Sequence, residues 1–209
     1  MKNAHHVPPD KLAPHSQSIQ PAWVRITHWL NLVAVLIMML SGWRIYNASP
    51  LFGFHFPNAI TLGGWLAGGL QWHFAAMWLL VANGLFYLVM NIVTGRFRRR
   101  FFPLSVPAAL RDIAAAMRGK LAHPNLAEYN AAQKLFYVGV VVVIVLTVLS
   151  GLAIWKSVQF PLLRVLMGGY DAARWVHFIG MSAIALFLVI HVVMVLLVPR
   201  TLIIMLRGR

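Results

Sequence analysis

Four long stretches of the chain are almost entirely apolar, and polar or charged residues separate them. A helix rises about 1.5 Å per residue, so roughly 20 apolar residues cross the hydrocarbon core of a bilayer. The third stretch, KLFYVGVVVVIVLTVLSGLAIW, is the most apolar. We therefore predict an all-α integral membrane protein, a four-helix bundle whose helices span about residues 23–43, 72–94, 134–155 and 174–198.

The segments outside the spans differ in character. Residues 1–20 are polar and contain proline, which predicts a flexible cytoplasmic tail ahead of one membrane domain over 21–209. No apolar signal region precedes the first span, which is expected to serve as an uncleaved anchor. The stretch NAITLGGWLAGGLQ before the second span is apolar but rich in glycine, and we interpret it as interfacial or re-entrant. No internal repeat is apparent.

The composition supports a membrane protein and orients it. Charged residues make up 11% of the chain, against about a quarter of a soluble domain. The N-terminal tail with the start of the first span, the 95–134 connection and the C-terminus hold fourteen of the eighteen Lys and Arg. By the positive-inside rule, both termini and the middle connection are cytoplasmic. The net charge of +14 is thus a topology signal, and no nucleic-acid partner is expected.

Four of the nine histidines lie in or at the edge of the spans: His28, His73, His177 and His191. His177 and His191 are fourteen residues apart, which places them about 21 Å apart along a helix and within roughly 40° of one face. Counted from the arginines at the span ends, His73 is level with His177 and His28 is level with His191. The histidines therefore form an outer pair, His73 with His177, and an inner pair, His28 with His191.

Two level histidine pairs favour a particular kind of cofactor. A single histidine in a span is explained equally well by a hydrogen bond to a neighbouring helix. Two facing pairs suit a planar cofactor held from both faces, and a haem between helices needs such a pair. Two imidazoles are too few for zinc, and the spans contain no Asp or Glu. The absence of cysteine excludes disulfides and a covalently attached c-type haem.

An iron with two imidazole ligands lacks an open position, which favours electron transfer over oxygen chemistry. Arg25 precedes His28 by one turn and Arg174 precedes His177 by one turn, where each could pair with haem propionates. Snorkelling to the membrane interface explains both arginines equally well.

At these residues the sequence resembles the bacterial di-haem cytochrome b561 family, which includes the b-type cytochromes of Ni-Fe hydrogenases and the gamma subunit of formate dehydrogenase. The features that carry the resemblance are Arg25-Ile26-Thr27-His28-Trp29, Trp72-His73, and His177 with His191, and it covers about residues 20–200. It implies two non-covalent haems b in a bacterial inner membrane. By this resemblance, His73 and His177 would bind the outer haem, and His28 and His191 would bind the inner haem.

The resemblance also implies an electron-transport function. Family members connect a periplasmic redox enzyme with the quinone pool, so we expect a subunit of a quinone-linked oxidoreductase of a respiratory chain. The partner would be an enzyme of the molybdopterin, hydrogenase or dehydrogenase type, and a homodimer is a further arrangement to consider. A stand-alone superoxide:ubiquinone oxidoreductase is the alternative. From another class, the alternatives are a haem-free membrane anchor or assembly subunit, or a small transporter.

Quinone chemistry moves protons with electrons and therefore needs a polar group beside the cofactor. On the inner side the polar candidates are Arg25, Asn31 and Lys134, although Asn31 suits an interhelical hydrogen bond at least as well. The long apolar connections 44–71 and 156–173 are candidates for docking a periplasmic enzyme, or for lying flat on the lipid. His55 and His123 lie in connections and are expected to be dispensable for haem.

Overall fold

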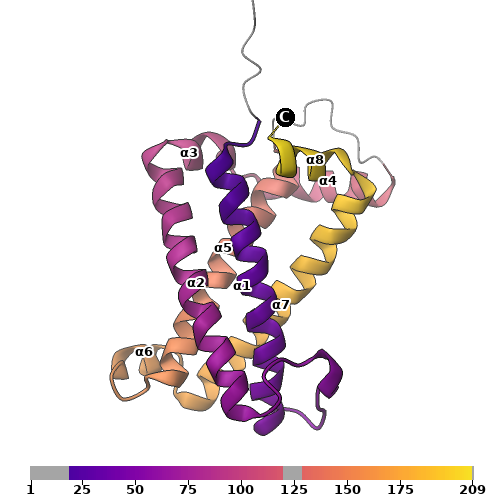
Figure 1. Cartoon of the computed structure of the whole chain (residues 1–209). Helices are drawn as coiled ribbons and strands as arrows, with labels where there is room; N and C mark the ends of the chain where they lie inside the picture. The colour runs from indigo at the N-terminus through magenta and orange to yellow at the C-terminus, as the bar shows by residue number, and fades with distance from the viewer. Residues whose placement is uncertain (1–18, 120–128, 209) are drawn as a thin grey trace, which may run out of the picture.

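The computed structural model describes residues 19–119 and 129–208, so most of the predicted tail lies outside the described residues. Four long helices run side by side (Figure 1), each long and apolar enough to cross a membrane. They are α1 (Ala22–Ala48), α2 (Leu66–Val93), α5 (Ala131–Trp155) and α7 (Tyr170–Leu197). Within the described residues the chain forms helices and no strand, which confirms the predicted all-α membrane bundle.

Shorter helices lie at the two ends of the bundle (Figure 1). One end carries α3 (Arg96–Phe101), α4 (Val106–Met117) and α8 (Arg200–Arg207). The other end carries the 3₁₀ helix η2 (Asn58–Ile60) and α6 (Pro161–Leu166). We call the first the basic end, because α3, α4 and α8 contain most of the described arginines, and the second the opposite end.

The four long helices pack as two antiparallel pairs, α1 with α2 and α5 with α7. The residues buried where these helices meet are small. Ala34 and Ser41 on α1, and Ser150 and Ala153 on α5, are fully buried. Small side chains let helix backbones approach closely, which is how membrane helices pack when water supplies no hydrophobic driving force between them.

The start of α5 is determined by a set of side-chain acceptors. Asn130 accepts from the backbone N–H of Gln133 at 2.8 Å, and the Gln133 side chain accepts from the N–H of Asn130 at 3.1 Å. The carboxylate of Asp112, on α4, accepts from the N–H of Ala131 at 2.8 Å. A capping box and an anion at a helix N-terminus satisfy the free N–H groups there, so α4 holds the start of α5 at the basic end.

The second half of the glycine-rich stretch before the second predicted span, from Leu66 to Gln71, is part of a helix and not a separate re-entrant segment. α2 begins at Leu66, six residues before the predicted start near residue 72. Gly69 lies directly against α1, because a Cβ there would meet the Arg44 side chain at 2.9 Å. Contact with α1 therefore outweighs the low helix propensity of glycine. The preceding turn uses Gly63 at φ +106°, a backbone conformation that favours glycine.

Candidate functional site

The structure places His28 and His191 next to one another near the basic end. His28 projects from α1 and His191 from α7. Their ring centroids are 6.0 Å apart and the ring planes are inclined at 59°. These are the residues that the sequence places in the inner pair.

His73 and His177 form a second pair near the opposite end. His73 projects from α2 and His177 from α7. Their ring centroids are 6.3 Å apart with the planes at 63°. α7 thus supplies one histidine to each histidine pair. The other two histidines lie on α1 and α2, the helices that pack together beside α5 and α7.

The spacing of the rings suits an iron held between them. With iron–nitrogen bonds of about 2 Å on both sides, two imidazole centres would lie roughly 6 Å apart. Both pairs meet this distance. Among residues 19–119 and 129–208, no group of three or more His, Asp or Glu could hold a metal ion, so these sites offer two protein ligands each.

The ring of His73 is anchored to α1 through Nδ1. The carbonyl oxygen of Met38 lies 3.1 Å from Nδ1, and the Ser41 hydroxyl lies 3.1 Å from it. A carbonyl can only accept, so Nδ1 carries the proton and Nε2 of the neutral ring keeps its lone pair. Gly42 leaves room for the ring, since a Cβ there would lie 3.5 Å from Cε1 of His73.

His177 is anchored to α5 in the same way. Its Nδ1 lies 2.9 Å from the carbonyl oxygen of Thr147 and 3.2 Å from the Ser150 hydroxyl. A Cβ on Gly151 would lie 3.0 Å from Cε1 of the ring. The triplet Leu-Ser-Gly occurs at residues 40–42 on α1 and again at residues 149–151 on α5. This short repeat was the available signal for both anchors, and sequence reasoning missed it.

The histidine pair near the basic end has no comparable anchor. Within the described part of the chain, no hydrogen bond joins a ring nitrogen of His28 or His191 to a protein group. Aromatic rings surround them instead. Trp29 lies edge-on to His28 with centroids 5.4 Å apart, and Phe187 stacks on His191 at 5.8 Å.

Arg25 and Arg174 both bond the C-terminal end of another helix. Arg25 Nη1 donates to the carbonyl oxygen of Leu206 on α8 at 2.7 Å. Arg174 Nη2 donates to the carbonyl oxygen of Ser49, just after α1, at 2.5 Å. A cation is favourable at a helix C-terminus, where carbonyl groups are free. Both arginines keep further N–H groups, and Nε of Arg25 is buried without a partner among the described residues.

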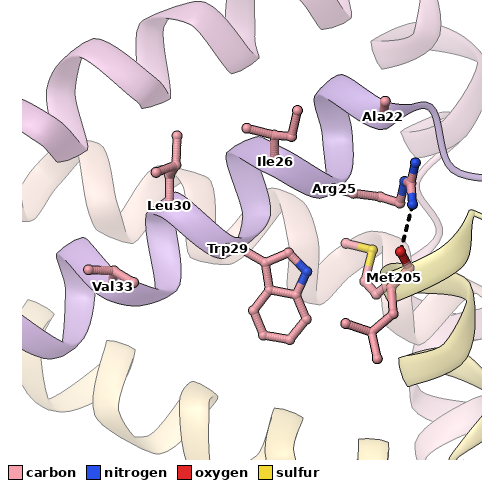
Figure 2. A pocket seen from close by; sticks show the side chains of 8 residues that line it. Ala22, Arg25, Ile26, Trp29, Leu30, Val33 and Met205 are labelled. Atoms are coloured by element: carbon pink, nitrogen blue, oxygen red, sulfur yellow. Dashed lines mark hydrogen bonds between the residues drawn. The ribbon is translucent and has the colours of Figure 1, made fainter.

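A groove of about 430 Å³ lies between the start of α1 and α8 (Figure 2). Its walls are mainly apolar, and Trp29 extends into it from α1. Arg25 closes its end through the bond to Leu206 (Figure 2). The groove therefore combines apolar walls with a cation one turn from His28. The residues that line it are Ala22, Arg25, Ile26, Trp29, Leu30, Val33, Met205 and Leu206.

The three predicted quinone residues do not share one site. Asn31 faces α2, where its side-chain oxygen accepts from Asn83 at 2.6 Å. Asn83 also donates to the carbonyl oxygen of Thr27 at 2.8 Å, so Asn31 takes part in an interhelical hydrogen-bond network. Lys134 lies in the first turn of α5. Of the three, Arg25 alone lines the described groove.

The connection after α1 folds over the first turns of α7 through aromatic side chains. Phe52 packs against Trp175 with ring centroids 4.9 Å apart, and against Phe178 at 5.4 Å. Phe178 is the residue after His177. Asn47 holds this connection by bonding both the N–H and the carbonyl of Phe56 at 2.8 Å. His55 is exposed there, whereas His123 lies outside the described residues.

The comparisons with known proteins agree on one family. Residues 19–208 match the family model described as prokaryotic cytochrome b561. A protein of Azospira oryzae, provisionally named protein-methionine-sulfoxide reductase subunit YedZ1, is 60% identical over 191 residues. The match covers 91% of this chain and 96% of that protein.

Proposed function

The chain belongs to the prokaryotic cytochrome b561 family, and from this premise we propose that it binds two haems b, one between His28 and His191 and one between His73 and His177. Family membership makes it a multi-pass electron-transport protein of the bacterial inner membrane with haem b as its cofactor. The number of haems and the ligand pairs are our proposal. The observation that carries it is the presence of two imidazole pairs with centroids 6.0 and 6.3 Å apart.

Bound haem b supplies one-electron transfer, and ligation by two histidines leaves no open iron position for oxygen. The protein holds the ligands on rigid membrane helices. Arg25 and Arg174, each one turn from a ligand histidine, are the proposed partners of the haem propionates. An arginine has five N–H donors, and these two arginines use only some of theirs on the carbonyl groups at helix ends.

We propose that the basic end faces the cytoplasm, so that both termini are cytoplasmic. The described arginines gather there on α3, α4 and α8, and lysine and arginine are enriched on the cytoplasmic side of membrane proteins. A fluorescent protein fused after Arg209 should therefore be fluorescent, and alkaline phosphatase fused there should be inactive. Active phosphatase would show that the C-terminus lies in the periplasm and that the proposed orientation is wrong.

With this orientation, the opposite end meets the periplasm, where we propose that a molybdopterin oxidoreductase docks and receives electrons. The relative from Azospira oryzae carries the name of a methionine sulfoxide reductase subunit, which supports a partner that reduces oxidised methionine in proteins. The docking surface would include the α6 patch, which consists of Leu162, Val165 and Leu166. These three side chains are 71%, 66% and 73% exposed.

The partner proposal predicts that a molybdenum-containing enzyme from periplasmic extract binds the purified chain and that Leu166→Glu weakens this binding. A carboxylate there would be desolvated in an apolar interface. Leu110→Glu is the matched control, because Leu110 is similarly exposed but lies on α4 at the basic end. Equal binding by the Leu166→Glu and Leu110→Glu variants would show that the α6 patch is not part of the interface. Rapid haem reduction by superoxide, with no partner bound, would favour the stand-alone alternative.

We further propose that quinol is oxidised in the groove between α1 and α8. Its apolar walls suit an isoprenoid tail, and the guanidinium of Arg25, which lines the groove, supplies N–H donors for a quinone oxygen. Trp29 connects the groove to the haem ligand, since its ring lies 5.4 Å from that of His28. Electrons would then enter at the basic end and leave at the opposite end.

Replacement of Trp29 by leucine or of Arg25 by glutamine is expected to slow quinol-driven haem reduction at least tenfold, equivalent to about 1.4 kcal/mol, with little change in the haem spectrum. Stopped-flow absorbance measures the rate. Asn31→Leu provides the comparison, because Asn31 bonds α2 and does not line the groove. If Asn31→Leu slows the reaction and the groove variants do not, the quinone site lies elsewhere.

A further inference from the structure

The two histidine pairs differ in how their rings are held. His73 and His177 each contact a backbone carbonyl and a serine of the helix beside them. The rings of His28 and His191 have no such contact within the described residues. Both serines are fully buried, so water does not compete for their hydroxyl groups.

The direction of each hydrogen bond can be deduced at the first anchor. Ser41 donates its hydroxyl proton to the carbonyl oxygen of Ile37 at 2.6 Å. Its oxygen lone pairs are then free to accept from Nδ1 of His73 at 3.1 Å. The carbonyl oxygen of Met38 also accepts from this N–H at 3.1 Å, so the imidazole proton is shared by two acceptors.

The second anchor, on α5, is similar, but its serine donates to the same carbonyl that accepts from the histidine. Ser150 donates to the carbonyl oxygen of Thr147 at 3.0 Å, and its oxygen lies 3.2 Å from Nδ1 of His177. The Thr147 carbonyl also accepts directly from Nδ1 at 2.9 Å. In both anchors the serine follows the carbonyl residue by three positions and a glycine follows the serine.

We propose that Ser41 and Ser150 are positioning residues that hold His73 and His177 in the Nδ1–H tautomer and tune the haem between them. Two acceptors on one Nδ1–H increase the basicity of the opposite nitrogen, and a more basic axial ligand favours ferric iron and lowers the reduction potential. The anchors also prevent rotation of the rings. The inference rests on the proposed ligation of haem by His73 and His177.

Ser41→Ala, Ser150→Ala and the double variant test the inference in the purified haem-loaded protein. Spectroelectrochemical titration should show a positive shift of one of the two midpoint potentials, largest in the double variant. Low-spin ferric EPR should show a changed signal for the same haem, because that signal depends on the angle between the two imidazole planes. The other haem should keep its potential and its signal.

Two controls separate hydrogen bonding from packing. Ser182 on α7 bonds the carbonyl oxygen of Phe178 at 2.9 Å but contacts no histidine, so Ser182→Ala should leave both potentials unchanged. Cysteine at position 41 or 150 fills the serine volume but accepts hydrogen bonds weakly. Ser41→Cys and Ser150→Cys should therefore resemble the alanine variants. If the cysteine variants matched the wild type while the alanine variants shifted, packing would be the cause and the inference would be wrong.

The haem content of the wild type distinguishes a failure of the proposed ligation from a failure of the proposed serine role. A wild-type preparation without the haem between His73 and His177 would refute the proposed ligation, and this inference with it. Two haems in the wild type, with unchanged potentials and EPR signals in the double variant, would refute only the role of the serines.

Discussion

Replacing either member of a histidine pair with alanine is expected to remove one haem and leave the other. His28→Ala and His191→Ala should give the same residual spectrum and potential, because their rings face one another at 6.0 Å. His73→Ala and His177→Ala should give a different common spectrum, since they form the pair at 6.3 Å. Each variant should lose about half of the Soret absorbance, as an iron with one remaining protein ligand is weakly held.

Optical redox titration and the haem-to-protein ratio measure these effects in the four variants. His55→Ala is the matched control, because His55 is an exposed histidine in the connection after α1. It should keep the wild-type spectrum. If His28→Ala and His73→Ala left the same residual haem, the pairing proposed from the ring positions would be wrong.

Gly180→Ala is expected to destabilise the protein and to disturb the haem near the opposite end. A Cβ at Gly180 would overlap Oγ1 of Thr147 and lie 3.3 Å from Cβ of Thr147, so the Thr147 side chain or α5 itself would have to move. Overpacking of this kind costs about 1–3 kcal/mol. The Thr147 carbonyl holds His177, so movement of α5 should also weaken that anchor.

Thermal unfolding in detergent, followed by the Soret band, measures this effect. Gly139→Ala and Gly84→Ala are matched controls, because a Cβ at either position meets nothing within 4 Å. Both lie inside helices, where alanine is favoured over glycine by about 1 kcal/mol, so neither should lower the melting temperature. Addition of Thr147→Ala to Gly180→Ala removes the closest contact and should restore stability. A melting temperature unchanged by Gly180→Ala alone would show that the helices do not approach this closely.

The long helices and the neighbouring histidines could be predicted because both depend on distance along a helix. An apolar run of sufficient length implies a span, and residue counting places His28 level with His191. The start of α2 could not be predicted in this way. Gly68 and Gly69 lower helix propensity, and contacts made by both offset this: Gly69 packs against Arg44 of α1, and Gly68 packs against the turn at Gly63.

The surroundings of the histidines depend on contacts between segments far apart in the sequence. The sequence allows Arg25 to pair with haem propionates or to snorkel to the membrane interface, but its bond to Leu206 depends on where α8 folds back against α1. Ser41 and Ser150 look like ordinary small residues of a membrane helix until the rings of His73 and His177 are placed beside them. Comparison of the two Leu-Ser-Gly triplets could have identified these serines from sequence.

The haem content of the purified wild-type chain tests the central claim most directly. Pyridine haemochrome absorbance gives the amount of haem b, and quantitative amino-acid analysis gives the amount of protein. Two imidazole pairs at ligand spacing predict two haems b per chain, which should titrate as two separate one-electron components. A saturated preparation with a single haem b per chain, from cells with ample haem, would contradict the claim.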